Sequence, residues 1–188
     1  IGKNCSIQWT QFETGSLLTW KYPSCVLLGN FSNGEFFSIS FTKDKQLADT
    51  GTKMWHIGKN TNSKILSKSI SMNKSLNCYR GQVKIGQNAI SSKNFSQCDS
   101  FILHNSCNIK THPYIDIFNM MSTVEHEARI SKITKEQLFF LQQRGFSIEN
   151  ATELILNSFC NDILLLLPIE FSLEIKNFLF LKLNSNIA

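Results

Sequence analysis

The chain has 188 residues, of which 42% are hydrophobic and 18% are charged, and its formal net charge is +5. This composition excludes an intrinsically disordered chain, and the length allows one sizeable domain or two small ones. The lysines are scattered along the sequence rather than clustered, so the modest positive charge is weak evidence for a nucleic-acid partner and we expect none.

The pattern of polar and apolar residues in 1–133 predicts β-strands. Polar and apolar residues alternate in short stretches, such as 6–10, 35–41 and 63–67, and Gly, Asn and Ser separate these stretches. Alternation with a period of two is typical of a strand with one buried face, and the three separating residue types favour turns. No helical period is sustained here, so the region predicts an all-strand domain.

A short pattern recurs within this region. Ile1-Gly2-Lys3-Asn4 returns as Leu28-Gly29-Asn30, Ile57-Gly58-Lys59-Asn60 and Ile85-Gly86-Gln87-Asn88, with starts 27, 29 and 28 residues apart (28 − 1, 57 − 28, 85 − 57). A fixed period of this size predicts a solenoid, each repeat one coil of a parallel β-helix, because a single coil cannot bury its apolar face alone. An antiparallel sandwich with coincidental turn motifs is the alternative.

The pattern changes after residue 133. Thr134 followed by Gln137 fits a capping box, in which each side chain bonds the backbone of the other residue. Gly145 is a good helix stop. We therefore predict a first helix that begins after Thr134 and ends before Gly145.

Two further helices are predicted beyond it. The second runs from about Ser147 to Leu167, and Pro168 ends it or opens the next helix. Its expected inner face consists of Ala151, Leu154, Ile155 and Phe159. The third runs from Ile169 to about Leu183 and carries more apolar residues than a simple amphipathic helix needs, so it is either mostly buried or faces a partner.

No Cys-x-x-Cys pair is present among the six cysteines, which argues against a structural zinc site. The sequence has no signal-peptide pattern, and nothing indicates the secreted environment in which disulfides form. The longest apolar run, residues 163–167, is far too short to span a bilayer. We expect a piece of a longer protein with no membrane span, whose thiols are mostly buried or half-buried side chains: Cys5, Cys25, Cys78, Cys98, Cys107 and Cys160.

One of these thiols is a candidate for chemistry. Cys98 lies in a predicted strand, where it shares a face with Ser96 and Ser100. Strand parity does not decide whether this face points to the core or to solvent. A thiolate is the soft ligand that iron–sulfur chemistry needs, and it also accepts sulfur as a persulfide. A single cysteine in a strand is nevertheless more often structural.

The second candidate is the run Glu125-His126-Glu127-Ala128. As a strand it places Glu125 and Glu127 on one face and His126 on the other, so it offers two carboxylates and an imidazole for a metal. A solvated edge strand whose charges discourage aggregation is the alternative. The sequence has neither a P-loop nor a nucleophile elbow, which argues against an ATPase or a hydrolase.

Longer stretches keep the order and spacing of a known family. Besides Glu125-His126-Glu127-Ala128, they are Trp9-Thr10-Gln11, Trp20-Lys21-Tyr22-Pro23-Ser24, residues 48–54 and 56–61, Tyr79-Arg80-Gly81, Asn94-Phe95-Ser96-Gln97-Cys98-Asp99-Ser100, Gln143-Arg144-Gly145 and Leu167-Pro168-Ile169-Glu170-Phe171. Together they cover essentially the whole chain, which resembles the SufB/SufD family of iron–sulfur cluster assembly proteins, in its C-terminal part. SufD lacks the context of Cys98, so that residue favours the SufB branch.

The resemblance implies a mainly β fold, with the C-terminal part of a parallel β-helix (solenoid) core in residues 1–133 and a small C-terminal helical domain in residues 134–188. It implies a scaffold subunit rather than an enzyme, without catalytic residues, on which a transient iron–sulfur cluster is held. Cys98 and Glu127 fall on the implicated residues, so both are expected to bind the cluster as metal ligands.

Partners and a compartment follow from the same resemblance. SufB-type proteins pair with SufD through the ends of their β-helices, bind the ATPase SufC through their C-terminal helices, and receive sulfur from donor proteins, with no nucleic-acid or membrane partner. The residue usage is typical of a plastid-encoded copy, so the stroma of a plastid such as an apicoplast is expected. The alternative is a SufD-like or truncated interaction module that binds SufC and SufD without building a cluster.

Three positions depart from the family pattern. Arg129 stands where a small hydroxyl residue is usual, and on a strand it shares a face with Glu127, where it would compete with a metal for the carboxylate. Ser158 replaces a usual glycine in the second predicted helix. The stretch around Lys110 and His112 differs from the family, so no ligand role carries over to His112.

Overall fold

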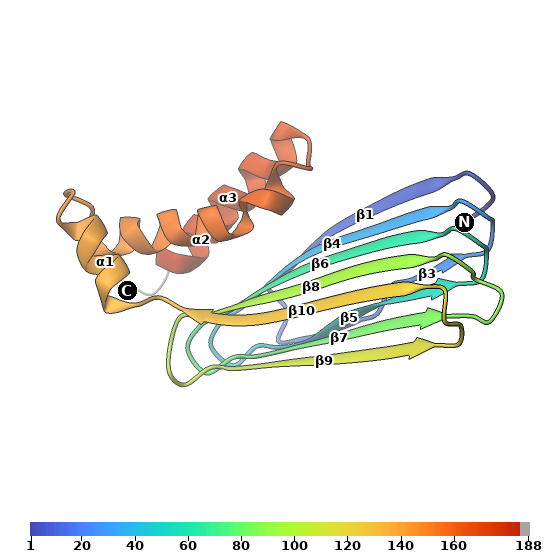
Figure 1. Cartoon of the computed structure of the whole chain (residues 1–188). Helices are drawn as coiled ribbons and strands as arrows, with labels where there is room; N and C mark the ends of the chain where they lie inside the picture. The colour runs from blue at the N-terminus through green and yellow to red at the C-terminus, as the bar shows by residue number, and fades with distance from the viewer. Residues whose placement is uncertain (185–188) are drawn as a thin grey trace. The chain divides into compact units, whose positions relative to one another are not determined.

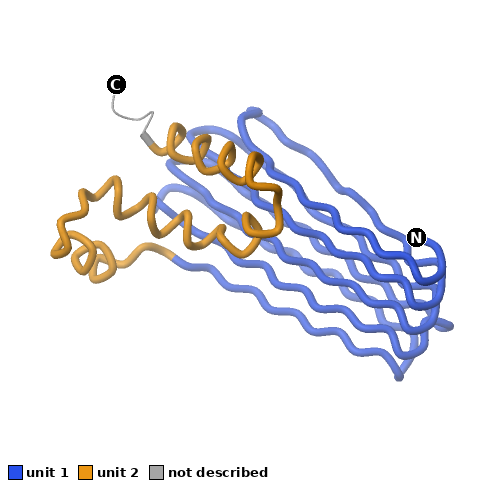
Figure 2. Tube along the Cα trace, turned by 90° about the horizontal axis from the view of Figure 1, so that it is seen from above, with its two compact units in different colours: residues 1–131 blue, residues 132–188 orange. Residues whose placement is uncertain are grey.

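A computed structural model describes residues 1–184, in which ten strands are followed by three helices (Figure 1). The chain divides into two compact units, residues 1–131 and the residues from 132 onward (Figure 2). Positions 185–188 of the predicted helical domain lie outside the described residues. Among the described helices, none combines the length and the apolarity that crossing a membrane requires.

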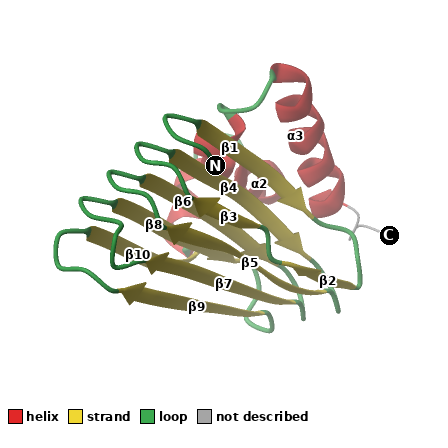
Figure 3. Cartoon of the chain, turned by 90° about the vertical axis from the view of Figure 1, so that its right-hand side faces the viewer, coloured by secondary structure: helices red, strands yellow, loops and turns green. Residues whose placement is uncertain are grey.

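The strands form two parallel sheets between which the chain passes back and forth (Figure 3). The first sheet has the order β1 (Ser6–Glu13), β4 (Asn33–Thr42), β6 (Asn62–Ser71), β8 (Lys93–Ile102) and β10 (Thr123–Lys132). The second has the order β2 (Leu18–Lys21), β5 (Leu47–His56), β7 (Leu76–Ile85) and β9 (Asn108–Ile117), and β3 (Ser24–Leu27) also pairs with β5. This arrangement is a β-solenoid of about four turns, which confirms the predicted fold class.

The recurring turns stack in a column along the solenoid. At the same corner of successive coils, the left-handed conformation is adopted by Asn4, Phe31, Asn60 and Ser91, with φ of 56°, 59°, 53° and 56°. Backbone hydrogen bonds join each corner to the next coil, from Asn4 N to Asn30 O and from Phe31 N to Lys59 O, both at 3.0 Å. In the last copy the left-handed residue is Ser91 and not Asn88, because that turn is longer.

Alternate residues of each strand point into the space between the two sheets, here called the inner face. The core cluster on this face consists of Phe36, Met54, Ile65, Tyr79, Val83, Ile85, Ala89 and Cys98. Buried hydroxyl and amide groups share the interior, where Ser38 Oγ donates to Ser67 Oγ at 3.0 Å and Asn77 Nδ2 donates to Ser40 Oγ at 3.0 Å. Such groups are tolerated because they bond one another across neighbouring coils.

The second unit contains α1 (Lys135–Gln142), α2 (Ile148–Leu164) and α3 (Ile169–Asn184). Thr134 caps α1 in a capping box with Gln137, as predicted, and Gly145 adopts φ of 88° after the helix ends. The predicted inner face of α2 was partly wrong. Leu154 is 47% exposed, whereas the buried residues are Ala151, Leu156, Cys160, Ile163 and Leu164. The helical period alone leaves the rotation of such an apolar-rich helix undetermined by about one residue.

Helix α3 is not mostly buried, which was one of the two alternatives that its apolar content left open. Its exposed apolar side chains are Ile169, Phe171, Leu173, Phe180 and Leu181, each at least 41% exposed, while Leu179 is buried. Most of its apolar surface among the described residues is therefore open to solvent or to a partner.

Candidate functional site

Cys98 lies on β8 with its side chain on the inner face of the solenoid. Its exposed fraction is 3%, and the side chains that alternate with it on β8, such as Ser96 and Ser100, are buried too. Its partner on the neighbouring strand β6 is Ser67. The structure thus decides what strand parity had left open: the thiol points to the core.

The surroundings of Cys98 keep its thiol protonated at neutral pH. Burial, and to a smaller extent the negative charge of Asp99, raise the pKa of Cys98 to about 12. Tyr79 belongs to the same core cluster, and burial raises the pKa of its phenol, with Cys98 adding to the effect. Among the described residues the Tyr79 hydroxyl has no hydrogen-bond partner. A thiol in these surroundings must lose its proton, to a base or on binding a metal ion, before it reacts as a thiolate.

Glu127 lies on β10, the last strand of the first sheet, and points away from the core. Val124 of the same strand packs against the core cluster, so residues 125, 127 and 129 lie on the opposite, outer face. Glu127 is bonded by Arg129, whose Nη2 lies 2.9 Å from Oε2, and both side chains are largely exposed. An exposed ion pair of this kind contributes about 0–1 kcal/mol to stability.

His126 is the residue of this run that points inward. Its Nε2 atom is buried and has no hydrogen-bond partner among residues 1–184, and burial lowers the pKa of the imidazole. The imidazole is therefore neutral at pH 7 and free to bind a metal or to accept a proton. The alternation of the strand already separates His126 from Glu125 and Glu127 in the sequence, but the family resemblance pointed to Glu127 as the ligand.

The register between β8 and β10 follows from one hydrogen bond. Thr123 N donates to Ser92 O at 3.0 Å, as Lys93 N donates to Thr61 O at 2.9 Å one coil earlier, where Lys93 pairs with Asn62. The same register places Ala128 beside Cys98. The smallest chiral side chain therefore lies between the thiol and the end of the solenoid.

Cys98 and Glu127 thus lie on neighbouring strands but on opposite faces of the sheet. His126 shares the inner face with Cys98, one inward position away. Within the described part of the chain, no group of three or more His, Cys, Asp or Glu residues is arranged to hold a metal ion. All six cysteines are free thiols, so Cys98 is not part of a disulfide.

The solenoid is open at the coil that carries these residues. Strands β9 and β10 are last in their sheets, and no further described strand pairs with them. Inward-pointing residues of this coil are consequently exposed, with Ile115 at 38%, Ile117 at 44% and Ile130 at 60%. An unpaired strand edge beside exposed apolar side chains is a template for pairing with another chain.

Residues 1–159 match the family described as SUF system FeS cluster assembly, SufBD core domain. The chain is 54% identical over 185 residues to the iron–sulfur cluster assembly SufBD family protein ycf24 of Galdieria sulphuraria, an alignment that covers 98% of this chain and 84% of the relative.

Other relatives are considerably longer than this chain. It is 53% identical over 187 residues to a SufBD family protein of Synechocystis sp. and 48% identical over 187 residues to one of Arabidopsis thaliana. These alignments cover 100% of this chain but 39% and 34% of those two relatives. The chain therefore spans little more than a third of their length.

Proposed function

The chain belongs to the SufBD family of the SUF system for iron–sulfur cluster assembly, and on that premise we propose that it is a SufB-type scaffold, a non-enzymatic subunit on which a transient iron–sulfur cluster is built. The observation that carries the proposal is the buried, free Cys98 one strand from the open end of the solenoid. A thiolate ligand at a closable edge is suited to a cluster that must later leave.

In this proposal the cluster is cargo, and Cys98 is its sulfur ligand. Iron displaces the thiol proton, since the thiolate is the form that binds metal. Ala128 leaves room between the sulfur and the open end. His126 is the second inward donor, and Glu127 supplies a carboxylate from the outer face of the same edge strand. Arg129 holds that carboxylate at 2.9 Å and competes with iron for it.

SufD is the proposed partner at the open end. The unpaired edges of β9 and β10 and the exposed Ile115, Ile117 and Ile130 favour a second β-solenoid that continues the coil stack. Such pairing would close the end of the solenoid over Cys98 and bring ligands from the partner to the same place.

SufC is the proposed partner of the helical unit. Phe171 and Leu173 of α3 are 58% and 53% exposed. Large apolar side chains exposed together on one helix are typical of a surface that binds another protein. Replacing both with Ser should abolish co-purification with SufC, while Leu179→Ala, at a buried position of the same helix, tests for simple loss of folding. Undiminished SufC binding by the double variant would place the ATPase elsewhere.

We propose the stroma of a plastid as the compartment, with the apicoplast as the specific case. The Arabidopsis relative is named chloroplastic, which supports the plastid. Sulfur-donor proteins are the remaining expected partners, and neither a nucleic acid nor a membrane is proposed.

Anaerobic reconstitution of the chain with SufC and SufD, followed by measurement of bound iron and sulfide, tests the scaffold. Cys98→Ser should remove most of the cluster, with an unchanged circular dichroism spectrum. Cys78→Ser is the matched control, because that thiol is also buried, 4% exposed against 3%, but lies on the second sheet. Full cluster content in Cys98→Ser together with loss in Cys78→Ser would show that Cys98 is not the ligand and that Cys78 is required instead.

Two further results separate the alternatives. Absence of iron–sulfur absorbance in every complex would favour the interaction module that binds SufC and SufD without building a cluster. Comparing the cluster content of His126→Ala with that of Glu127→Ala shows which of the two residues contributes more as the second ligand. Arg129→Thr should raise the cluster content if the Glu127 carboxylate is a ligand. Unchanged content in Glu127→Ala would remove Glu127 from the site.

A further inference from the structure

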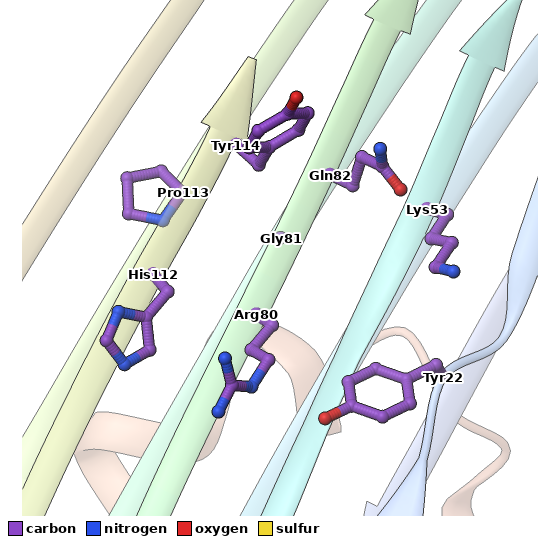
Figure 4. Close-up of a pocket in the computed structure, with 8 residues that line it drawn as sticks. All are labelled: Tyr22, Lys53, Arg80, Gly81, Gln82, His112, Pro113 and Tyr114. Carbon is purple, nitrogen blue, oxygen red and sulfur yellow. The ribbon is translucent and has the colours of Figure 1, made fainter.

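A pocket of about 450 Å³ lies on the outer face of the second sheet, away from Cys98. It lies across three strands, and the register places Arg80 beside His112 in one row and Lys53, Gln82 and Tyr114 in the next. Tyr22, from the segment between β2 and β3, forms one side (Figure 4). Residues from four separate segments therefore converge on this space.

Arg80, one of the residues that line the pocket, is held in place by Asp49. Its Nε lies 3.0 and 3.3 Å from the two oxygens of Asp49, and Nη2 lies 3.2 Å from Oδ2. The Tyr22 hydroxyl donates to Asp49 Oδ1 at 2.5 Å. Burial alone would raise the pKa of Asp49, but the hydrogen bonds from Arg80 and Tyr22 outweigh it and hold the pKa below its usual range. Asp49 is therefore a carboxylate committed to orienting the guanidinium.

This anchoring leaves part of the guanidinium unused. The Nε–Nη2 edge, which binds a planar carboxylate side-on, is occupied by Asp49, whereas Nη1 forms no hydrogen bond with the described residues. The side chains of Lys53, Gln82 and His112 likewise form no hydrogen bond with any residue of 1–184. Four donors thus face one space from three strands, with no carboxylate besides Asp49 among the lining residues and their anchors.

Donors that line one pocket from three neighbouring strands can approach an anion from several directions, which suits a tetrahedral anion better than a planar one, and Arg and Lys are the usual phosphate ligands. The pocket is also larger than an inorganic phosphate needs. Tyr114, which is 58% exposed, offers an aromatic face beside the donors. We propose that this pocket binds an aromatic phosphate monoester, whose phosphate contacts Lys53, Arg80 and His112 and whose ring packs on Tyr114.

Phenyl phosphate is the simplest probe of this site, titrated into the chain and followed by NMR chemical shifts at fixed ionic strength. Inorganic phosphate, benzoate and benzyl alcohol test the phosphate and the ring separately. Phenyl phosphate should bind more tightly than all three. Benzoate binding as tightly as phenyl phosphate would overturn the assignment of the anion, and equal binding of inorganic phosphate would overturn the assignment of the ring.

Variants at the exposed donors test the location. Lys53→Gln and His112→Gln should each weaken phenyl phosphate binding about twofold to fivefold, the loss of one hydrogen bond to an exposed anion. Tyr114→Leu should weaken the binding of phenyl phosphate without affecting the binding of inorganic phosphate. These positions have no bond to lose in the free protein, so folding should be intact, whereas Arg80→Gln would leave Asp49 without its cation.

Lys64→Gln is the matched control, since Lys64 lies on the outer face of the first sheet. It should leave binding unchanged. No measurable binding, or equal weakening by Lys64→Gln and Lys53→Gln, would show that the pocket is not a phosphate site. Because the titration contains no iron or sulfide, either outcome leaves the scaffold proposal untouched.

Discussion

Acid should destabilise the solenoid through His56, a buried residue at the end of β5. The imidazole is 1% exposed, with Nδ1 2.7 Å from Thr61 Oγ1 and Nε2 2.8 Å from Ser63 Oγ. Thr61 Oγ1 donates to Gly58 O, and Ser63 Oγ accepts from Asn94 Nδ2. We assign the neutral tautomer in which Nδ1–H donates to Thr61 and Nε2 accepts from Ser63, because it satisfies this network.

Burial lowers the pKa of His56 from 6.5 to about 4. The unfolded chain therefore binds a proton between pH 6.5 and 4 that the folded chain does not, so stability falls as the pH falls through this window and levels off below it. Each pKa unit corresponds to about 1.4 kcal/mol, which gives a loss of about 2 kcal/mol between pH 6.5 and 5 and about 3 kcal/mol in total.

Urea unfolding of the wild-type chain and of His56→Gln at pH 7, 6 and 5 measures the effect. Gln keeps a hydrogen-bonding amide but does not titrate, so the wild type should lose about 2 kcal/mol more than the variant over this range. His126 and the carboxylates are present in both chains, so their contributions cancel. An NMR titration of wild-type His56 gives the same information if the variant folds poorly. Equal pH slopes for both chains, or a measured pKa near 6.5, would refute the reasoning.

Four substitutions test the turns and the first helix by thermal or urea unfolding. Gly58→Ala should cost about 1–3 kcal/mol, because its Cβ would lie 2.5 Å from Gly29 O, whereas Gly2→Ala, whose nearest neighbour is Cys5 Sγ at 3.8 Å, should cost far less. Phe31→Asn should stabilise by about 1 kcal/mol, since Phe31 is 59% exposed and has φ of 59°, and a loss would contradict the strain argument. Thr134→Ala should cost the helical unit about 1 kcal/mol, and no change would mean that the capping box is dispensable.

Local patterns determined much of this fold. The recurring Gly turns predicted parallel coils because a solenoid repeats one corner per coil, and the structure stacks those turns. Thr134 and Gln137 predicted the start of α1 because a capping box depends on residues three positions apart. Such features are set by neighbours in the sequence, so the sequence alone was sufficient to find them.

The direction of the candidate ligands needed the tertiary structure. On β4, apolar residues occupy both faces, with Phe36 in the core cluster and Phe37, Ile39 and Phe41 on the other side, so alternation could not say which face is inner. The same ambiguity on β8 left Cys98 unassigned. Only the stacking of coils settled that Cys98 and His126 face inward and Glu127 outward.

No spacing in the sequence indicated the phosphate pocket, although Tyr22, Asp49 and Arg80 each lie in a stretch that keeps the family pattern. Tyr22, Asp49 and Arg80 are separated by 27 and 31 residues and belong to three different segments. The register of parallel strands brings them together because each coil places its residues directly over those of the coil before. Residues that meet from different coils are not separated by a short, fixed spacing in the sequence, whereas the residues of a cap or a turn are. The tertiary structure was therefore needed to find the pocket.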